Sequence, residues 1–63
     1  MKFTVKQARQ YAGLTQENVA KSLKIDRTTY LKYEKRPDVM PAGKAMEFSL
    51  LVGISLNDII FLT

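Results

Sequence analysis

The 63-residue chain contains no cysteine and no histidine. The absence of cysteine excludes disulfide bonds, thiolate nucleophiles and zinc sites built from cysteine. The absence of histidine removes the most common general base, pH-sensing group and metal ligand of proteins. The carboxylates and hydroxyls that remain are scattered, and no acid stands where a helical neighbour would complete a catalytic pair. We therefore expect no enzyme, no metal or other cofactor, and no small-molecule ligand.

Long apolar runs are also missing. The stretch from Phe48 to Leu56 is far shorter than the roughly twenty apolar residues that a membrane-spanning helix needs. The first ten residues, MKFTVKQARQ, lack the apolar segment of a secretory leader. These observations predict a cytoplasmic protein with no membrane partner. At this length we expect one domain, residues 1–63, whose small core would benefit from oligomerisation.

Positive charge is concentrated in the first two thirds of the chain. All ten Lys and Arg residues lie between Lys2 and Lys44, whereas residues 45–63 carry only Glu47 and Asp58. The net charge of +4 with this asymmetry suits a polyanionic partner, because each cation placed on a phosphate releases condensed counterions. A solvated basic surface with no such partner is the alternative.

The sequence from Gln16 to Lys35 has a helical periodicity that is interrupted once. Thr15 and Asp26 each precede a periodic segment and are suitable N-caps, because their side-chain oxygens can accept hydrogen bonds from free backbone N–H groups. The pattern predicts helices over 16–23 and 27–35 that meet across a tight turn. The apolar or small residues that set it are Val19, Ala20, Leu23, Ile25, Tyr30 and Tyr33.

The segment LTQENVAKSLKIDRTTYLKYEK resembles the Cro/repressor (XRE-type) helix-turn-helix family. The specific marks are Gln16 at the start of the first helix, Ala20 at its fifth position and the apolar set around them. Downstream, AMEFSLLVGISLNDII is similar to the last two helices of that family. The resemblance implies an all-α, compact five-helix domain that binds double-stranded DNA. Two residues depart from the family pattern: Lys24 stands where Gly is usual, and Tyr30 where Ile or Val is common.

Three further helices complete the predicted fold. Residues 4–12 form the first, and Gly13 is suited to the left-handed position that follows a helix end. The segment RPDVMP contains both prolines, so we expect no helix there and a loop that lies against DNA. A fourth helix spans 42–52, and a fifth begins after Ser55, whose spacing to Asp58 resembles a capping box.

The helix over 27–35 is the expected recognition helix, because the major groove admits an α-helix whose N-terminal side chains reach base edges. Spacings of one and four place Arg27, Thr28 and Lys32 on one side of it. Arg27 can donate two hydrogen bonds to guanine, Thr28 can contact a thymine methyl group, and Lys32 can reach a guanine or a phosphate. The resemblance implies that these positions read bases; ordinary exposed polar side chains are the alternative.

Other residues are candidates for contacts with DNA phosphates or between helices. Gln16 is the first, since its amide and nearby backbone N–H groups can hold a phosphate. By resemblance, Arg9 and Glu34 form an internal salt bridge that would fix the first helix against the recognition helix. Further phosphate contacts are expected from residues on or after the recognition helix: Thr29, Lys35, Arg36 and Lys44.

The end of the chain carries more apolar residues than one helix face can bury. Some of this surface is therefore expected to meet a second copy, although packing beneath the first and fourth helices is the alternative. The residues assigned to this dimer interface are Leu56, Ile59, Ile60, Phe61 and Leu62.

The sequence thus favours a sequence-specific transcriptional regulator, a Cro-like repressor that binds operator DNA as a homodimer and excludes polymerase. A protein-interaction module, such as an antitoxin or adaptor that uses the apolar C-terminal helix, is the alternative. RNA binding fits the basic face, but the aromatic residues are spaced as core residues rather than as exposed stacking platforms.

Overall fold

The structure is a computed structural model, which describes residues 2–61. Within this range it contains four α-helices, two short 3₁₀ helices and two short strands. In chain order these are β1 (Phe3–Thr4), α1 (Val5–Tyr11), α2 (Gln16–Ser22), α3 (Arg27–Lys35), η1 (Pro37–Val39), α4 (Ala42–Val52), η2 (Leu56–Asp58) and β2 (Ile59–Ile60). No helix in the described range is long and apolar enough to span a membrane.

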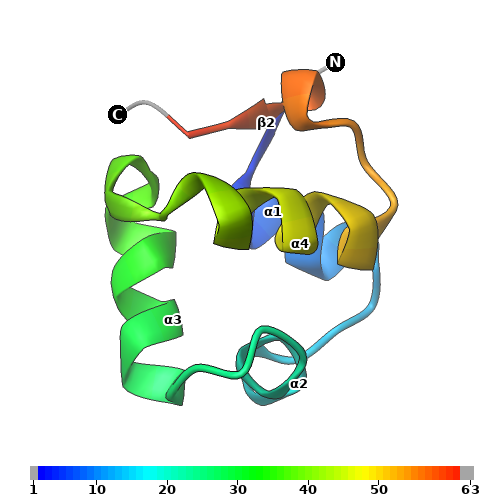
Figure 1. Cartoon of the computed structure of the whole chain (residues 1–63). Coiled ribbons are helices and arrows are strands. Elements are labelled where there is room, and N and C mark those ends of the chain that lie inside the picture. The colour runs from blue at the N-terminus through cyan, green and yellow to red at the C-terminus, as the bar shows by residue number, and fades with distance from the viewer. Residues whose placement is uncertain (1, 62–63) are drawn as a thin grey trace.

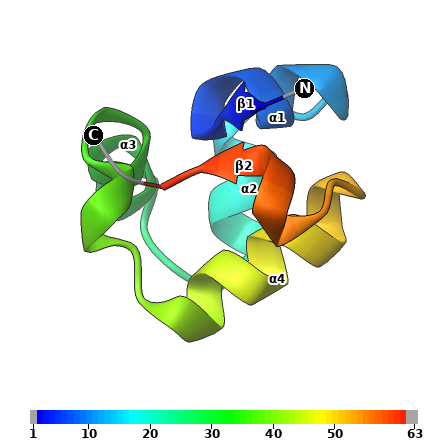
Figure 2. The ribbon, with the colours of Figure 1, turned by 90° about the horizontal axis from the view of Figure 1, so that it is seen from above.

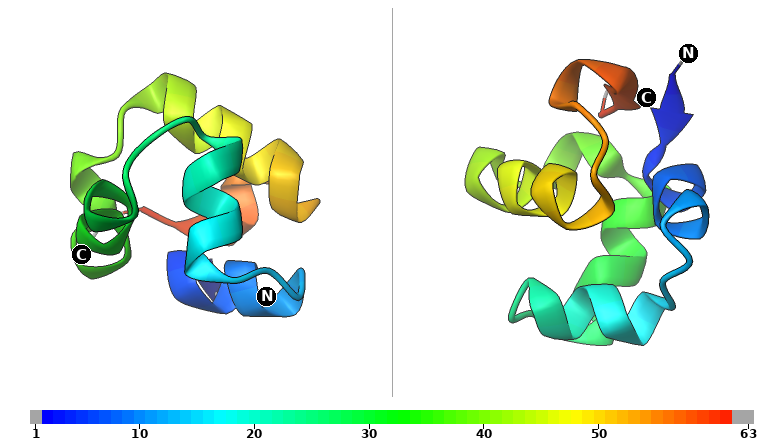
Figure 3. Two further views of the ribbon diagram at one scale, coloured as in Figure 1. Left: turned by 90° about the horizontal axis from the view of Figure 1, so that it is seen from below. Right: turned by 90° about the vertical axis from the view of Figure 1, so that its right-hand side faces the viewer.

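Helix α2 and the small sheet lie at opposite ends of the molecule (Figure 1). Helix α3 runs along one side between these ends, and α4 crosses the middle. Seen from above, β2 lies between α1 and α4 (Figure 2). The separation of α2 from the sheet is equally visible from the side (Figure 3, right).

The prediction of a fifth helix is wrong. Ser55 begins only one 3₁₀ turn, in which its hydroxyl accepts a hydrogen bond from the Asn57 backbone N–H, and no capping box with Asp58 forms. The chain then becomes extended, and β2 pairs in parallel with β1, with Phe3 opposite Ile59. Two consecutive β-branched residues favour this extended backbone. The predicted all-α fold is therefore corrected to four helices and a two-stranded parallel sheet in the described range.

The predicted helix starts and ends are otherwise close to those observed. Thr15 and Asn18 form a reciprocal capping box at the start of α2, as Thr4 and Gln7 do at the start of α1. Gly13 has φ +73°, the left-handed conformation expected after a helix end. Asp26 occupies the N-cap position of α3, but its side chain makes no capping hydrogen bond, contrary to the prediction.

The proline-containing segment after α3 is also more ordered than predicted. Pro37–Val39 forms the 3₁₀ helix η1, closed by hydrogen bonds from Val39 to Arg36 and from Met40 to Pro37. Proline is tolerated at the first position of a helical turn, because its missing N–H would have no intrahelical partner there. The expectation that no residue of this segment is helical is therefore wrong.

The core is built where the helices cross. Ala20 is buried between α2 and α3, and its small side chain lets the two helices approach closely. Tyr30 is fully buried and its ring lies 6.4 Å from that of Phe48, centroid to centroid. The other buried side chains come from all four α-helices and from the segment after α4, and include Val5, Ala8, Val19, Leu23, Tyr33, Ala45, Val52, Ile54 and Ile59.

Lys24 should have the most strained backbone conformation in the turn between α2 and α3. Its φ is +58°, the only positive φ of a non-glycine residue in the described range. Replacing it with glycine removes the Cβ clash, so Lys24→Gly should raise the free energy of unfolding by about 1 kcal/mol in a urea titration. For a domain of this size that corresponds to about 4–8 °C in Tm.

A matched control for Lys24→Gly is Lys21→Gly in α2. There the backbone is helical, so glycine should lower the free energy of unfolding by about 1 kcal/mol. If both substitutions destabilised the chain equally, the turn at Lys24 would carry no strain.

Candidate nucleic-acid interface

The turn between α2 and α3 is closed by backbone hydrogen bonds from residues that follow the helix. Lys24 N–H donates to Lys21 C=O at 3.1 Å, and Ile25 N–H donates to Ala20 C=O at 3.0 Å. These bonds satisfy carbonyls at the helix end, and they require the left-handed conformation at Lys24. Ile25 then packs against the core. This turn sets the angle at which α3 leaves α2.

Helix α3 has one buried side and one polar side. Tyr30 and Tyr33 face the core, whereas Arg27, Thr28 and Lys32 are exposed to solvent. Because one helical turn takes 3.6 residues, these three polar residues occupy the first two turns of the helix on its outer side. The structure therefore brings the three residues predicted to read bases onto one accessible face.

The exposed face of α3 is tied to α2 through Gln16. Arg27 Nη2 lies 3.4 Å from Gln16 Oε1, a long hydrogen bond at the surface. Gln16 Nε2 donates at 3.0 Å to Glu34 Oε1, seven residues further along α3. The amide of Gln16 is thus held at both ends, and its carbonyl oxygen faces the guanidinium of Arg27.

Glu34 also binds the first helix. Arg9 Nε lies 2.7 Å from Glu34 Oε2, and the two side chains are only 11% and 8% exposed. Arg9 Nη1 donates a second hydrogen bond at 2.9 Å to the carbonyl oxygen of Leu14. The ion pair expected from the family resemblance is present, and each carboxylate oxygen of Glu34 has its own partner.

This arrangement shifts the pKa values of two titratable groups, Glu34 and Tyr30. Burial favours the neutral form of Glu34, but the neighbouring Tyr30 hydroxyl, the hydrogen bonds from Arg9 and Gln16 and the charge of Arg9 outweigh it and lower its pKa. Burial, and then the adjacent Glu34 carboxylate, raise the pKa of Tyr30. The Tyr30 hydroxyl makes no hydrogen bond of good geometry. It therefore stays a neutral group beside the ion pair.

Sequence reasoning missed the contact of Gln16 with Glu34 and Arg27. Gln16 and Glu34 are 18 residues apart, so no helical spacing relates them. A glutamine at the start of a helix is also common on protein surfaces, so the residue type alone does not indicate a contact with another helix. Only the crossing of α2 and α3 brings these side chains together.

The predicted phosphate-binding residues have different surroundings. Lys35 is exposed and Thr29 is half-buried. Arg36 makes two hydrogen bonds with the Asp38 carboxylate, at 3.1 and 2.9 Å, with its own side chain 62% exposed. Lys44 Nζ donates at 2.6 Å to the carbonyl oxygen of Leu23 at the end of α2. Arg36 and Lys44 thus already have partners within the chain.

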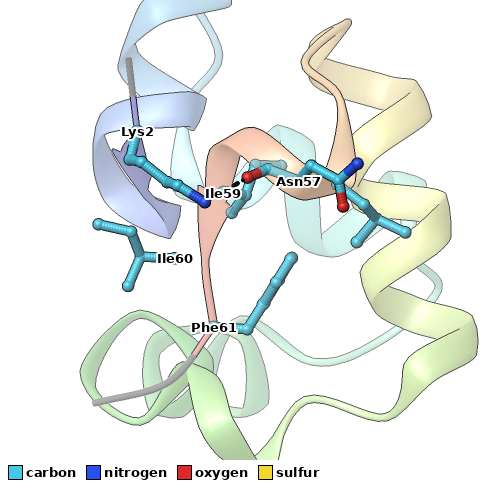
Figure 4. Close-up of a pocket in the computed structure, with 6 residues that line it drawn as sticks. Lys2, Asn57, Ile59, Ile60 and Phe61 are labelled. Atoms are coloured by element: carbon cyan, nitrogen blue, oxygen red, sulfur yellow. Dashed lines mark hydrogen bonds between the residues drawn. The ribbon is translucent and has the colours of Figure 1, made fainter.

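Four of the residues predicted for a dimer interface, Leu56, Ile59, Ile60 and Phe61, lie around a shallow apolar groove at the sheet end (Figure 4). Leu56 and Ile60 are 38% and 39% exposed, and Phe61 is half-buried. Lys2 crosses the groove and donates a 2.7 Å hydrogen bond to the carbonyl oxygen of Asn57. Ile59 is only 5% exposed, so it belongs to the chain's own core and offers little surface to a partner. Leu62 lies outside the described residues.

The geometry defines the class of protein. Two helices that meet at a tight turn, the second presenting a polar face whose first residues are accessible, form the DNA-binding helix-turn-helix architecture. The helix-turn-helix family model matches residues 5–48, and the chain belongs to this family, in its Cro/repressor (XRE) type. The family is one of DNA-binding transcription regulators. Comparisons with curated proteins and with solved structures gave no match.

The Arg9–Glu34 pair should contribute strongly to stability. Removing the carboxylate in Glu34→Ala leaves Arg9 with only the Leu14 carbonyl oxygen and leaves Gln16 Nε2 without its acceptor. The free energy of unfolding should therefore fall by about 2–3 kcal/mol in a urea titration. Arg36→Ala breaks a solvent-exposed pair and should cost much less, because water and salt screen such pairs. Equal losses in the two variants would contradict the bridging role of Glu34.

The same pair should make stability depend on acid pH. The pKa of Glu34 is lower in the folded chain than in the unfolded chain, so the folded state binds fewer protons. Its stabilisation is present above the unfolded value near pH 4.5 and is lost as the pH falls through the folded value. The stability difference between wild type and Glu34→Gln should therefore shrink as urea titrations move from about pH 6 to about pH 3. A constant difference would contradict the lowered pKa.

Proposed function

We propose that this protein is a sequence-specific transcriptional regulator that acts as a Cro-like repressor. In this proposal α3 enters the major groove of operator DNA, and occupation of the site excludes polymerase. The observation that carries it is the exposed row of Arg27, Thr28 and Lys32 on α3, whose opposite side is locked into the core by two buried tyrosines. A rigid helix with free polar side chains at its N-terminal half meets the geometric requirement for reading bases.

Each of these residues has a chemistry suited to a base edge. The Arg27 guanidinium matches guanine O6 and N7 with two parallel donors. Thr28 presents a methyl group and a hydroxyl, which suit a thymine methyl or a base acceptor. Lys32, one turn further, reaches a guanine or the backbone beside it. Together they would read part of each half-site through the major groove.

Backbone contacts would set the register of α3 in the groove. Lys35 is exposed and can reach a phosphate without giving up a partner, and Thr29 and Gln16 add neutral donors. Arg36 would exchange the Asp38 carboxylate for a phosphate, and Lys44 would have to leave the Leu23 carbonyl. Lys35 is therefore the strongest phosphate contact in this proposal, and Lys44 the weakest.

A homodimer is part of the proposal, formed through Leu56, Ile60 and Phe61 at the sheet end. Successive half-sites are about 34 Å apart on one face of DNA. One copy measures 28 × 23 × 18 Å, so two touching copies reach that spacing only when their recognition helices lie far from the contact between them. Strand β2, whose residues line the groove, and the start of α3 lie toward opposite ends of the molecule (Figure 1), which meets this condition.

Selection from a random-sequence duplex pool tests base reading. Wild type should enrich a palindromic site, and the double variant Arg27→Ala with Thr28→Ala should lose that preference while salt-sensitive background binding survives. Loss of the bidentate guanine contact alone should cost about 1–3 kcal/mol at that base position. The double variant leaves the core untouched, so its circular dichroism and Tm should match those of wild type.

Failure of this selection has a defined meaning. If wild type binds DNA with salt dependence but enriches no site, the helix-turn-helix serves a protein partner, and the apolar groove becomes its docking surface. The runner-up, an antitoxin-like or adaptor function, would then replace the repressor.

The dimer is tested by sedimentation at micromolar concentration. Ile60→Asp places a charge in the proposed interface, so a wild-type dimer should dissociate and its operator affinity should fall at least tenfold. The control is Leu50→Asp, since Leu50 is 83% exposed on α4 and lies outside the groove. A wild type that stays monomeric even on its selected DNA, or a dimer lost only in Leu50→Asp, would reject this interface.

A further inference from the structure

Two exposed apolar surfaces of this chain belong neither to the polar face of α3 nor to the apolar groove beside β2. The first lies on α4, where Leu50 is 83% exposed and Met46, four residues before it, is 57% exposed. Glu47, three residues before Leu50, is also exposed. Residues three and four apart share one face of a helix, so these three side chains form a single strip. We call it the Leu50 strip.

The second surface is a shallow hollow where β1 meets α1. It is lined by Lys2, Phe3, Gln7, Gln10 and Tyr11. The rings of Phe3 and Tyr11 pack at 5.3 Å, centroid to centroid, and Tyr11 is 69% exposed. A ring exposed to this extent leaves apolar area in water that a contact with another molecule would bury. We call this surface the Tyr11 hollow.

The polar groups beside Leu50 are hydrogen-bond acceptors. The last turn of α4 has no basic residue to offset the negative end of the helix dipole, and residues 45–63 contain no Lys or Arg. Glu47 makes a loose ion pair with Lys44 at 3.6 Å, and its side chain is still 51% exposed. The strip thus presents an apolar side chain flanked by negative charge.

The polar groups of the Tyr11 hollow are donors. Lys2 Nζ donates at 2.7 Å to a carbonyl oxygen of η2, which leaves two of its three N–H groups unused. Gln7 accepts the Thr4 N–H through Oε1 at 3.0 Å, and this bond does not use its amide N–H groups. Donors around an aromatic ring complement acceptors around an apolar side chain. The strip of one copy therefore matches the hollow of another copy in charge and polarity.

The strip and the hollow lie on opposite sides of the molecule. Seen from above, α1 and α4 flank β2 from either side (Figure 2), and the same arrangement is visible from the side (Figure 3, right). A copy whose strip fills a neighbour's hollow therefore keeps its own hollow open for a third copy. Such a head-to-tail contact extends as a row instead of closing into a pair.

We infer that the Leu50 strip of one copy binds the Tyr11 hollow of the next, and that this contact joins neighbouring copies on DNA. In it Leu50 packs on the Tyr11 ring, and the Glu47 carboxylate accepts N–H groups from the hollow. The contact itself is independent of the proposed function, whereas its use on DNA rests on that proposal.

The contact is small. It involves far fewer side chains than the roughly 20–30 residues on each side of a stable interface, so it is too weak to be seen by sedimentation at micromolar concentration. DNA that holds copies side by side raises their effective concentration and makes a weak contact count. We therefore expect it to act as a link between neighbouring bound copies.

The absence of cysteine allows a test by disulfide trapping. Leu50→Cys and Tyr11→Cys place one thiol on each surface, at exposed positions where the core is unaffected. A disulfide needs Cβ atoms about 3.5–4.5 Å apart, so its formation reports direct contact. The two variants are mixed on a long duplex at low salt, where non-specific binding concentrates them, and are then oxidised.

The mixture should give cross-linked pairs, and a variant that carries both substitutions should give a ladder of multimers. In the matched control, Ser22→Cys replaces Tyr11→Cys, because Ser22 is exposed on α2 and lies outside the hollow. Cross-linking should be about tenfold slower in this control, since only chance encounters bring its thiols together. Equal rates would overturn the contact. Cross-linking of either single variant with itself, as fast as in the mixture, would indicate a symmetric contact and would also overturn it.

The use of the contact on DNA is tested with duplexes that carry two selected sites. The spacing of the sites is varied over one helical turn of about 10.5 base pairs. At one spacing or more, wild type bound at the first site should raise affinity for the second by about fivefold or more. Leu50→Lys, which brings a cation toward Lys2, and Tyr11→Ala should each abolish this increase. Leu50→Met keeps an apolar side chain and should retain it.

Binding to a single site should be unchanged in all three variants, because neither Leu50 nor Tyr11 lies on α3 or in the groove beside β2. If the mixture cross-links but no site is enriched, the contact stands and the repressor proposal fails. If a site is enriched but the mixture cross-links no faster than the control, the contact is overturned and the repressor proposal stands. Cross-linking without cooperative filling of two sites at any spacing would overturn the use of the contact on DNA.

Discussion

One carboxylate joins three helices in this protein. Glu34 belongs to α3, and its two oxygens bind Arg9 on α1 and Gln16 on α2. The attraction is effective because the pair is nearly excluded from water, where charges would otherwise be screened. A chain of this size buries few apolar side chains, and their packing is not directional. The ion pair and hydrogen bonds of Glu34 are directional, so they fix the angles between the helices. The orientation of the recognition helix depends on that angle.

Glu34 therefore affects both the stability of the fold and the position of Arg27, the residue proposed to read a base. Arg27 at the start of α3 faces the carbonyl oxygen of Gln16, whose amide is oriented by Glu34 near the end of the same helix. This hydrogen bond is long and exposed, so it orients the Arg27 guanidinium without fixing its rotamer. The Arg9–Glu34 ion pair thus helps to position the exposed face of α3, although Glu34 lies behind that face.

The sequence predicted what is decided locally. The N-cap at Thr15, the left-handed Gly13 and the burial of Ala20 on α2 and of Tyr30 on α3 each follow from spacing and side-chain type within one helix. The errors concern contacts between distant residues. The stretch after Ser55 has a helical pattern, but its isoleucines pair with a strand at the other end of the chain. The hydrogen bonds of Gln16 with Glu34 and Arg27 could not be predicted from the sequence either, because they form only where α2 and α3 cross.

The pairing of β1 with β2 has a consequence for the order of folding. Lys2 and Asn57, which bond beside this pairing, are 55 residues apart, whereas each helix closes contacts over a few residues. Loop-closure entropy grows with the enclosed length, so the strand pair is the most expensive contact to form from an open chain. Each strand has only two residues, so the pairing also contributes few hydrogen bonds to offset this entropy. We expect it to be the region that opens first in hydrogen exchange, as an independent unit of low stability, while the helices remain folded.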